Sequence, residues 1–198
     1  MMKPTWDDTS YLLSGTARQR SAYHTLQALG VFTLLCRYTP TLVGTVSLNI
    51  DVEGSDLDII CKTYDLSIFA HQVATTFSRQ DSFRLETKKI SSMPSVTANF
   101  TFAGFPIEVF GQAQPVTSQH AYCHMIVEDR LLTIGGDKAR QEVRLLKQVG
   151  VKTEPAFARY FNLEGDPYQT LLQLATLSID ELRAFITGTT QQHGAQDG

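Results

Sequence analysis

Hydrophobic and polar residues alternate in parts of this chain and recur at helical spacing in others. The strictest alternation covers residues 95–102, where one face carries Val96, Ala98, Phe100 and Phe102 and the other carries Ser95, Thr97, Asn99 and Thr101. A period of two predicts a half-buried strand. Ala103-Gly104 then predicts a tight turn into a second apolar strand over 105–110, so the two segments form a hairpin.

Other segments complete a mixed set of strands and helices. Further strands are predicted over 41–46, 56–63 and 83–90, and helices over 17–29, 31–38 and 65–79, the last with Asp65 as N-cap. After Pro115 every segment has helical character, with helices predicted over 118–133, 137–149, 153–160, 166–175 and 178–186.

This order of elements predicts an α/β (α+β) fold, with a small mixed sheet and flanking helices followed by an all-helical part. We expect residues 1–115 to form the α/β core, residues 116–190 to form a helical part that packs on it, and residues 191–198 to be a disordered tail.

Composition narrows the class of protein. The chain of 198 residues is 42% hydrophobic and 19% charged, as expected for a soluble globular protein, and its net charge of -3 argues against an obligate nucleic-acid binder. Cys36, Cys61 and Cys123 are far apart and odd in number, which favours a reducing compartment. Since no signal peptide or membrane-spanning run is visible, we expect a cytoplasmic protein that does not bind membranes. Because of the net charge, we expect no binding to DNA.

The candidate chemistry centres on Asp56 and Asp58. In a strand their side chains lie on one face with Cα atoms about 6.5–7 Å apart, so they can hold one divalent ion or bridge two. Glu108 is a third carboxylate inside an apolar strand, where a charge is costly unless it is paired or binds metal. Together the three carboxylates predict a metal site of the kind that catalyses phosphoryl displacement.

Candidate phosphate ligands flank this acidic motif. Gly44 permits close approach of the backbone to a phosphate, and the hydroxyl of Thr45 can donate a hydrogen bond to it. The helix over 137–149 carries a basic stripe of Arg140, Arg144 and Lys147, within a segment (136–160) whose local balance is +3. This stripe is either a solvated helix face or a wall that binds phosphates or the acceptor.

These residues resemble the nucleotidyltransferase superfamily. Its signature is a strand ending in Gly-Ser or Gly-Gly, about ten residues of loop, Asp-x-Asp among apolar residues, and a later acidic residue on another strand; here ten residues, 46–55, separate Thr45 from Asp56. The resemblance is closest to a group of bacterial nucleotidyltransferase-like proteins of unassigned function. It is carried by the segments Leu42–Thr45, Glu53–Cys61, Ile107–Gln112 and Lys152–Ala158.

The resemblance implies a nucleotidyltransferase fold and a metal-dependent transferase. Asp56 and Asp58 would bind Mg²⁺ (or Mn²⁺) and the NTP phosphates, Ser55 would join Gly44 and Thr45 in binding the nucleotide, and Glu108 would complete the site. The expected reaction transfers a nucleoside monophosphate from an NTP to an unidentified acceptor, either a small molecule, an RNA or a protein. Two alternatives are a catalytically silent nucleotide-binding or protein-interaction module of this fold and a pyrophosphoryl transferase.

Other polar motifs have less specific interpretations. His120, His124 and Glu128 share one helix face at zinc-binding spacing, but a polar face with a hydrogen-bonded histidine fits better because no fourth ligand is nearby. An alternative is that this face lines a cleft over the sheet, where His124 would contact the nucleotide or the acceptor. Lys88 and Lys89 are interpreted as solubilising charges on an edge strand.

Overall fold

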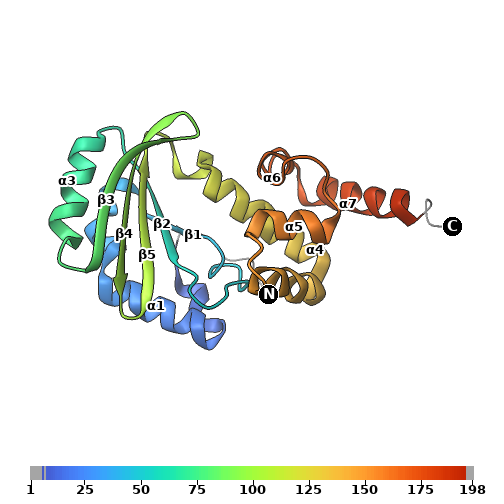
Figure 1. Cartoon of the computed structure of the whole chain (residues 1–198), viewed down its shortest axis with the longest axis horizontal. Coiled ribbons are helices and arrows are strands. Elements are labelled where there is room, and N and C mark those ends of the chain that lie inside the picture. Colours follow the sequence, from blue (N-terminus) through green and yellow to red (C-terminus); the bar gives the residue numbers. More distant parts are fainter. Residues whose placement is uncertain (1–5, 7, 195–198) are drawn as a thin grey trace. The chain divides into compact units, whose positions relative to one another are not determined.

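The structure is a computed structural model that describes residue 6 and residues 8–194. Contacts within the chain divide it into two compact units. The first consists of the described residues up to Asn49 together with Glu53–Tyr122, and the second of Ile50–Val52 and the described residues from Cys123 onward. Figure 1 labels the elements of both units.

The first unit is built on five strands. These are β1 (Thr41–Val43), β2 (Leu57–Lys62), β3 (Asp81–Ile90), β4 (Met93–Phe102) and β5 (Phe105–Gln112). They form one sheet in the order β1-β2-β5-β4-β3. Only the central pair, β2 and β5, is parallel, and the other three pairs are antiparallel. The sheet is therefore mixed, as the sequence predicts.

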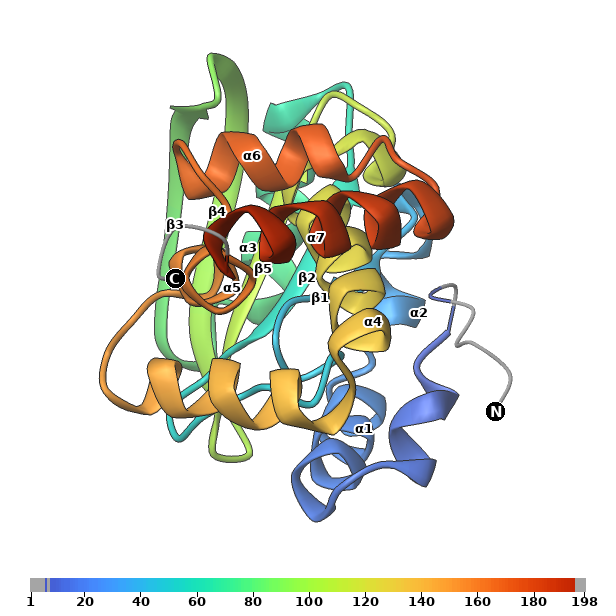
Figure 2. The ribbon, with the colours of Figure 1, turned by 90° about the vertical axis from the view of Figure 1, so that its right-hand side faces the viewer.

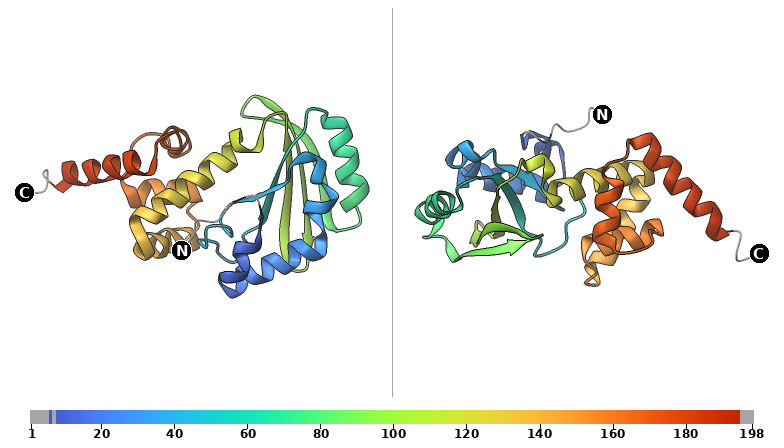
Figure 3. Two further views of the ribbon diagram at one scale, coloured as in Figure 1. Left: turned by 180° about the vertical axis from the view of Figure 1, so that it is seen from behind. Right: turned by 90° about the horizontal axis from the view of Figure 1, so that it is seen from above.

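Short helices connect and cover these strands. They are η1 (Ser10–Ser14), α1 (Ala17–Leu29), α2 (Val31–Leu34), η2 (Cys36–Tyr38), α3 (Leu66–Phe77) and η3 (Val116–Ser118). The side chain of Asp65 accepts a hydrogen bond from the N–H of Ile68, which confirms it as the N-cap of α3. Figures 1 and 3 show α1 and α3 on the same side of the sheet.

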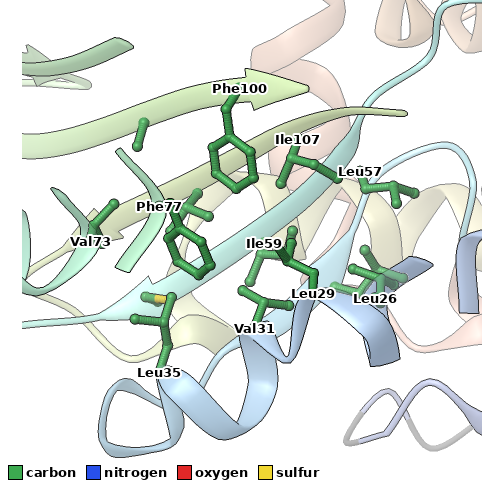
Figure 4. Packing of buried hydrophobic residues seen from close by; sticks show 14 of the residues in the cluster. Leu26, Leu29, Val31, Leu35, Leu57, Ile59, Val73, Phe77, Phe100 and Ile107 are labelled. Carbon is green, nitrogen blue, oxygen red and sulfur yellow. The ribbon is translucent and has the colours of Figure 1, made fainter. Parts of the chain in front are cut away.

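The core of this unit lies between that face of the sheet and the two helices. Leu57, Ile59 and Cys61 point into it from β2, opposite the face expected for Asp56 and Asp58. The rings of Phe77 and Phe100 stack with centroids 5.1 Å apart, and Figure 4 shows them beside Ile59 and Ile107. Because the apolar side chains of β2 are buried on this face, Asp58 lies on the opposite face of the strand.

The hairpin between β4 and β5 has the predicted tight turn. Phe102 pairs with Phe105, which leaves Ala103 and Gly104 as a two-residue loop. Both have positive φ, 47° and 80° respectively, as the commonest two-residue hairpin turn requires. This turn sets the register of β5 against β4, and so the position of Glu108.

The second unit is helical. It contains most of α4 (His120–Gln148), with α5 (Thr153–Phe161), α6 (Pro167–Leu174) and α7 (Ile179–Gly194). Helix α4 is broken at Gly136, whose φ of 64° and ψ of -156° are not helical, and Figure 2 shows its two halves running in different directions. The break separates the two helices that the sequence predicts over 118–133 and 137–149. A Cβ at the preceding Gly135 would crowd Ala139 and the ring of Phe161.

Some predicted boundaries differ from the observed ones. Strand β1 ends at Val43 rather than at residue 46, because Gly44 turns the chain with a φ of 83°. Helix α7 continues to Gly194, past the predicted start of the tail at residue 191, and the rest of the predicted tail, residues 195–198, lies outside the described residues. None of the described helices combines the length and apolar character needed to cross a bilayer.

Candidate active site

The central pair of parallel strands brings two of the predicted acidic residues together. Asp58 on β2 and Glu108 on β5 are direct register partners. Register partners on neighbouring strands point their side chains to the same face. This face is opposite the one that carries Leu57 and Ile59 into the core, so both carboxylates lie on the side of the sheet away from α1 and α3.

The third predicted acid, Asp56, lies two residues before Asp58 and just outside the ladder, since β2 begins at Leu57. Its side chain is exposed, whereas Asp58 and Glu108 are half-buried. The negative charge of Asp56 contributes to raising the pKa of Glu108, which places the two carboxylates within electrostatic reach of each other.

The surroundings of Glu108 oppose its ionisation. Burial raises the pKa of Glu108 above its ordinary value, the charge of Asp56 raises it further, and Lys88 on β3 lowers it. A carboxylate held in this way favours either a proton or a cation. Both properties suit a group that shares a cation with its neighbours or accepts a proton from an attacking hydroxyl.

Gly44 lies against the carboxylate of Asp58. A Cβ on this residue would overlap the Oδ2 atom of Asp58, and its φ of 83° is one that residues with side chains rarely adopt. The neighbouring Thr45 is half-buried. The backbone at the end of β1 therefore approaches the carboxylate as closely as a glycine permits, whereas the predicted approach of this turn to a phosphate stays a prediction.

The first turn of α1 holds both ends of the loop between Gly44 and Asp56. The side-chain amide of Gln19 donates to the carbonyl of Val46 at 2.9 Å. A guanidinium nitrogen of Arg18 donates to the carbonyl of Ser55 at 3.0 Å, and the same guanidinium lies 4.8 Å from the centroid of the Phe105 ring. These contacts fix the two loop ends that flank Asp58.

The chemistry of this donor set fits a divalent metal ion. Oxygen ligands from carboxylates are those that Mg²⁺ prefers, and a cation would relieve the like-charge repulsion that Glu108 experiences. As the side chains stand, however, no group of three or more carboxylate, imidazole or thiol groups within the described part of the chain forms a ready-made metal site. Metal binding by Asp56, Asp58 and Glu108 thus remains a prediction from residue type and register.

The same register adds two residues that the sequence did not single out. Asn99 on β4 pairs with Glu108, and Arg84 on β3 pairs with Asn99. The row across the sheet is therefore Asp58, Glu108, Asn99 and Arg84. The alternation over 95–102 already assigned Asn99 to the polar face, but only the strand order shows that this face continues the row of carboxylates.

The basic stripe belongs to the second unit. Arg140, Arg144 and Lys147 all lie in α4 after the break at Gly136. Lys147 donates to the hydroxyl of Thr153 at 2.7 Å and lowers the pKa of both Glu128 and Glu154. Lys147 therefore takes part in polar contacts of the second unit. The role of the stripe in phosphate binding remains a prediction.

Both histidines of this helix face contact polar groups. His124 is buried, with Nε2 3.1 Å from the carbonyl oxygen of Tyr168 and Nδ1 3.3 Å from a carboxylate oxygen of Glu154. His120 instead contacts the hydroxyl of Ser91 at 3.2 Å. The preferred interpretation, a hydrogen-bonded histidine, is thus confirmed for His124.

Comparison with protein families gives one match. A family model described as "Domain of unknown function (DUF4269)" matches residues 24–174, which include β1, β2, β5 and the candidate site. No curated protein sequence matches the chain.

Comparison with solved structures identifies polymerases of the nucleotidyltransferase fold. The polymerase core of TRAMP, an RNA surveillance complex, aligns with a TM-score of 0.50 and 15% identity, over 83% of this chain and 58% of that one. A mutant of the Cid1 poly(U) polymerase bound to MgATP aligns with a TM-score of 0.50 and 12% identity, over 82% and 53%. The chain spans little more than half the length of these structures. The likeness confirms the predicted fold.

Proposed function

The chain belongs to the DUF4269 family, and we propose that it is a metal-dependent nucleotidyltransferase that uses Asp56, Asp58 and Glu108. The observation that carries this proposal is the direct pairing of Asp58 with Glu108 on parallel strands, with Gly44 against Asp58 and Asp56 within electrostatic reach of Glu108. The fold shared with the polymerases supports it, since one of the similar structures is a poly(U) polymerase bound to MgATP.

In the proposed reaction the acceptor hydroxyl attacks the α-phosphorus of an NTP. A bond forms from the acceptor oxygen to phosphorus, the bond from this phosphorus to the bridging oxygen breaks, and pyrophosphate leaves. Mg²⁺ or Mn²⁺, held by Asp56, Asp58 and Glu108, would supply charge neutralisation at the phosphates. Gly44, Thr45 and Ser55 bind the nucleotide phosphates, and Glu108 receives the proton of the hydroxyl.

The test is incubation of the full chain with Mg²⁺ and NTPs labelled at the α-phosphate, followed by analysis of labelled products and of pyrophosphate. We expect Mg²⁺-dependent release of pyrophosphate, reduced at least about 100-fold in Asp58→Asn because one of the carboxylates that hold the metal is lost. Asp65→Asn, which keeps an N-cap residue on α3 away from the site, serves as the control. Unchanged activity in Asp58→Asn would exclude the proposed mechanism.

The same experiment separates the alternatives. Release of AMP from ATP would indicate pyrophosphoryl transfer, and calorimetry that detects Mg²⁺-NTP binding without any product would indicate a catalytically silent module. We further propose that the protein acts in the cytoplasm, that its acceptor is a small molecule, an RNA or a protein, and that it is related to bacterial nucleotidyltransferase-like proteins of unassigned function.

A further inference from the structure

A row of polar residues crosses four neighbouring strands on the carboxylate face of the sheet. It begins at Asp58 on β2, passes through Glu108 on β5 and Asn99 on β4, and ends at Arg84 on β3. Neighbouring strands lie about 4.8 Å apart, so the backbone positions of Glu108 and Arg84 are separated by about 10 Å. This span is suited to a ligand of the size of one nucleotide.

The outer half of this row is accessible and its polar groups are available. Asn99 and Arg84 are both exposed. Within the described residues, neither side chain forms a hydrogen bond or an ion pair. Lys88, four residues after Arg84 on the same face of β3, contacts Glu86 at 3.4 Å instead. Arg84 is therefore a cation on this face of β3 that is available to bind an anion next to the carboxylates.

The two sides of the carboxylates differ in character. On the side of β1, the backbone of Gly44 lies next to Asp58. The proposed function assigns this glycine to the NTP phosphates. On the side of β4 and β3, Glu108 is followed by the amide of Asn99 and then by the guanidinium of Arg84. In an in-line displacement the attacking and leaving oxygens lie on opposite sides of the phosphorus. The side of β4 and β3 is thus the one from which an attacking hydroxyl reaches Glu108.

We propose that Asn99 and Arg84 form an acceptor subsite that binds a phosphate-bearing acceptor, with its phosphate on Arg84 and its reactive hydroxyl directed towards Glu108 by Asn99. This inference rests on the proposed function. Arg84 holds the phosphate through charge-assisted hydrogen bonds. The phosphate belongs either to a mononucleotide or to the backbone of an RNA, since both present the same group.

Binding of acceptor probes to the full chain, without NTP or metal, tests the subsite directly. The probes are AMP, a 5′-phosphorylated tetraadenylate RNA and adenosine. We expect AMP or the RNA to bind, and adenosine to bind at least tenfold more weakly. Arg84→Gln should weaken the binding of both phosphate-bearing probes about tenfold, because an exposed guanidinium–phosphate contact is lost. The relative affinity of AMP and RNA identifies the source of the phosphate.

Lys89→Gln is the matched control, since Lys89 is an exposed cation on β3 whose side chain points to the opposite face of the sheet. It should change the affinity for the phosphate probes less than twofold. Equal effects of Arg84→Gln and Lys89→Gln would overturn the inference. So would equal affinity for AMP and adenosine, or failure of the unchanged chain to bind either phosphate probe.

Transfer kinetics distinguish failure of this inference from failure of the proposed function. With labelled NTP and Mg²⁺, Arg84→Gln should raise the KM for the acceptor about tenfold with little change in kcat, whereas Asn99→Ala should lower kcat because the hydroxyl loses its positioning contact. Transfer that does not depend on Arg84 refutes the subsite and leaves the transferase. Arg84-dependent binding of AMP without any transfer refutes the transferase and leaves the subsite.

Discussion

Gly44 is the residue whose replacement tests the site most sharply, because both its conformation and its surroundings exclude a side chain. Gly54, at the other end of the same loop, has nearly the same φ of 81°, but a Cβ there would meet nothing within 4 Å. The two glycines therefore share a backbone requirement and differ in contact with Asp58. Comparison of the two separates backbone strain from damage to the carboxylate.

We expect Gly44→Ala and Gly54→Ala each to lower the free energy of unfolding by about 1–2 kcal/mol, because both place an alanine in a left-handed conformation. Only Gly44→Ala should abolish Mg²⁺-dependent NTP binding, since its methyl group displaces Asp58. Denaturant unfolding and calorimetry measure the two effects. Retained nucleotide binding in Gly44→Ala would show that this close approach is not part of the nucleotide site.

At the scale of elements, the first turn of α1 connects helix capping with loop position. The side chain of Gln19 accepts from the N–H of Thr16 at 3.0 Å and its amide donates to the carbonyl of Val46. The hydroxyl of Thr16 accepts from the N–H of Gln19, so the two residues form a capping box. One buried side chain thus serves both the start of the helix and the start of the loop.

Gln19→Ala should lower the free energy of unfolding by about 1–3 kcal/mol, because it leaves buried backbone groups without a partner. It should also weaken Mg²⁺-NTP binding, since the loop after Gly44 loses one of its contacts. Gln27→Ala, at an exposed position of the same helix, should change stability by less than about 0.5 kcal/mol. Equal stability of the two variants would contradict this role of Gln19.

The break in α4 depends on a conformation that is almost restricted to glycine. Gly136 has a φ of 64° and a ψ of -156°, and a Cβ there would meet nothing within 4 Å. We expect Gly136→Ala to lower the free energy of unfolding by about 2 kcal/mol through backbone strain alone. Gly188→Ala, within α7 and equally uncrowded, should raise it by about 0.5–1 kcal/mol.

Thermal unfolding of these two variants provides the measurement. A lower Tm for Gly136→Ala together with a higher Tm for Gly188→Ala would support the view that the backbone conformation of Gly136 determines the break in α4. A stabilising effect of Gly136→Ala would instead show that α4 can continue straight through this position.

Local chemistry explains which elements the sequence predicts well. The N-cap of Asp65 and the alternation over 95–102 act within a few residues, so they can be recognised without knowledge of the fold. The pairing of Asn99 with Glu108 and Arg84 depends on strand order and register, which no local pattern contains. Asp56 and Asp58 could therefore be identified from the sequence, whereas the alignment of Asn99 and Arg84 with the carboxylates could not.

At the scale of the whole molecule, one buried carboxyl makes stability depend on pH. Burial raises the pKa of Glu128 well above its ordinary value of 4.5, the charge of Glu154 raises it further, and Lys147 lowers it. The folded chain therefore binds more protons at this group than the unfolded chain does, from about pH 4.5 up to the raised pKa. In this window the contribution of Glu128 to stability falls as pH rises.

Glu128→Gln removes this pH-dependent contribution. We expect the variant to have a higher Tm than the unchanged protein at pH 8 and a similar Tm at pH 4, where Glu128 is protonated in both states. Glu164→Gln, at an exposed position, should show no difference that depends on pH. A lower Tm for Glu128→Gln at pH 8 would show that the ionised carboxylate is stabilised by its neighbours.

The pairing of Asp58 with Glu108 also has a consequence for biosynthesis. Fifty positions of sequence separate these residues, and α3 and the hairpin strands β3 and β4 lie between them in the chain. At about 5–20 residues per second, a ribosome needs roughly 3–10 s to travel from one to the other. During that interval the apolar strand β2 has no parallel partner. The nascent chain therefore exposes an aggregation-prone edge until the last strand of the sheet emerges, and Asp58 and Glu108 become neighbours only at that moment.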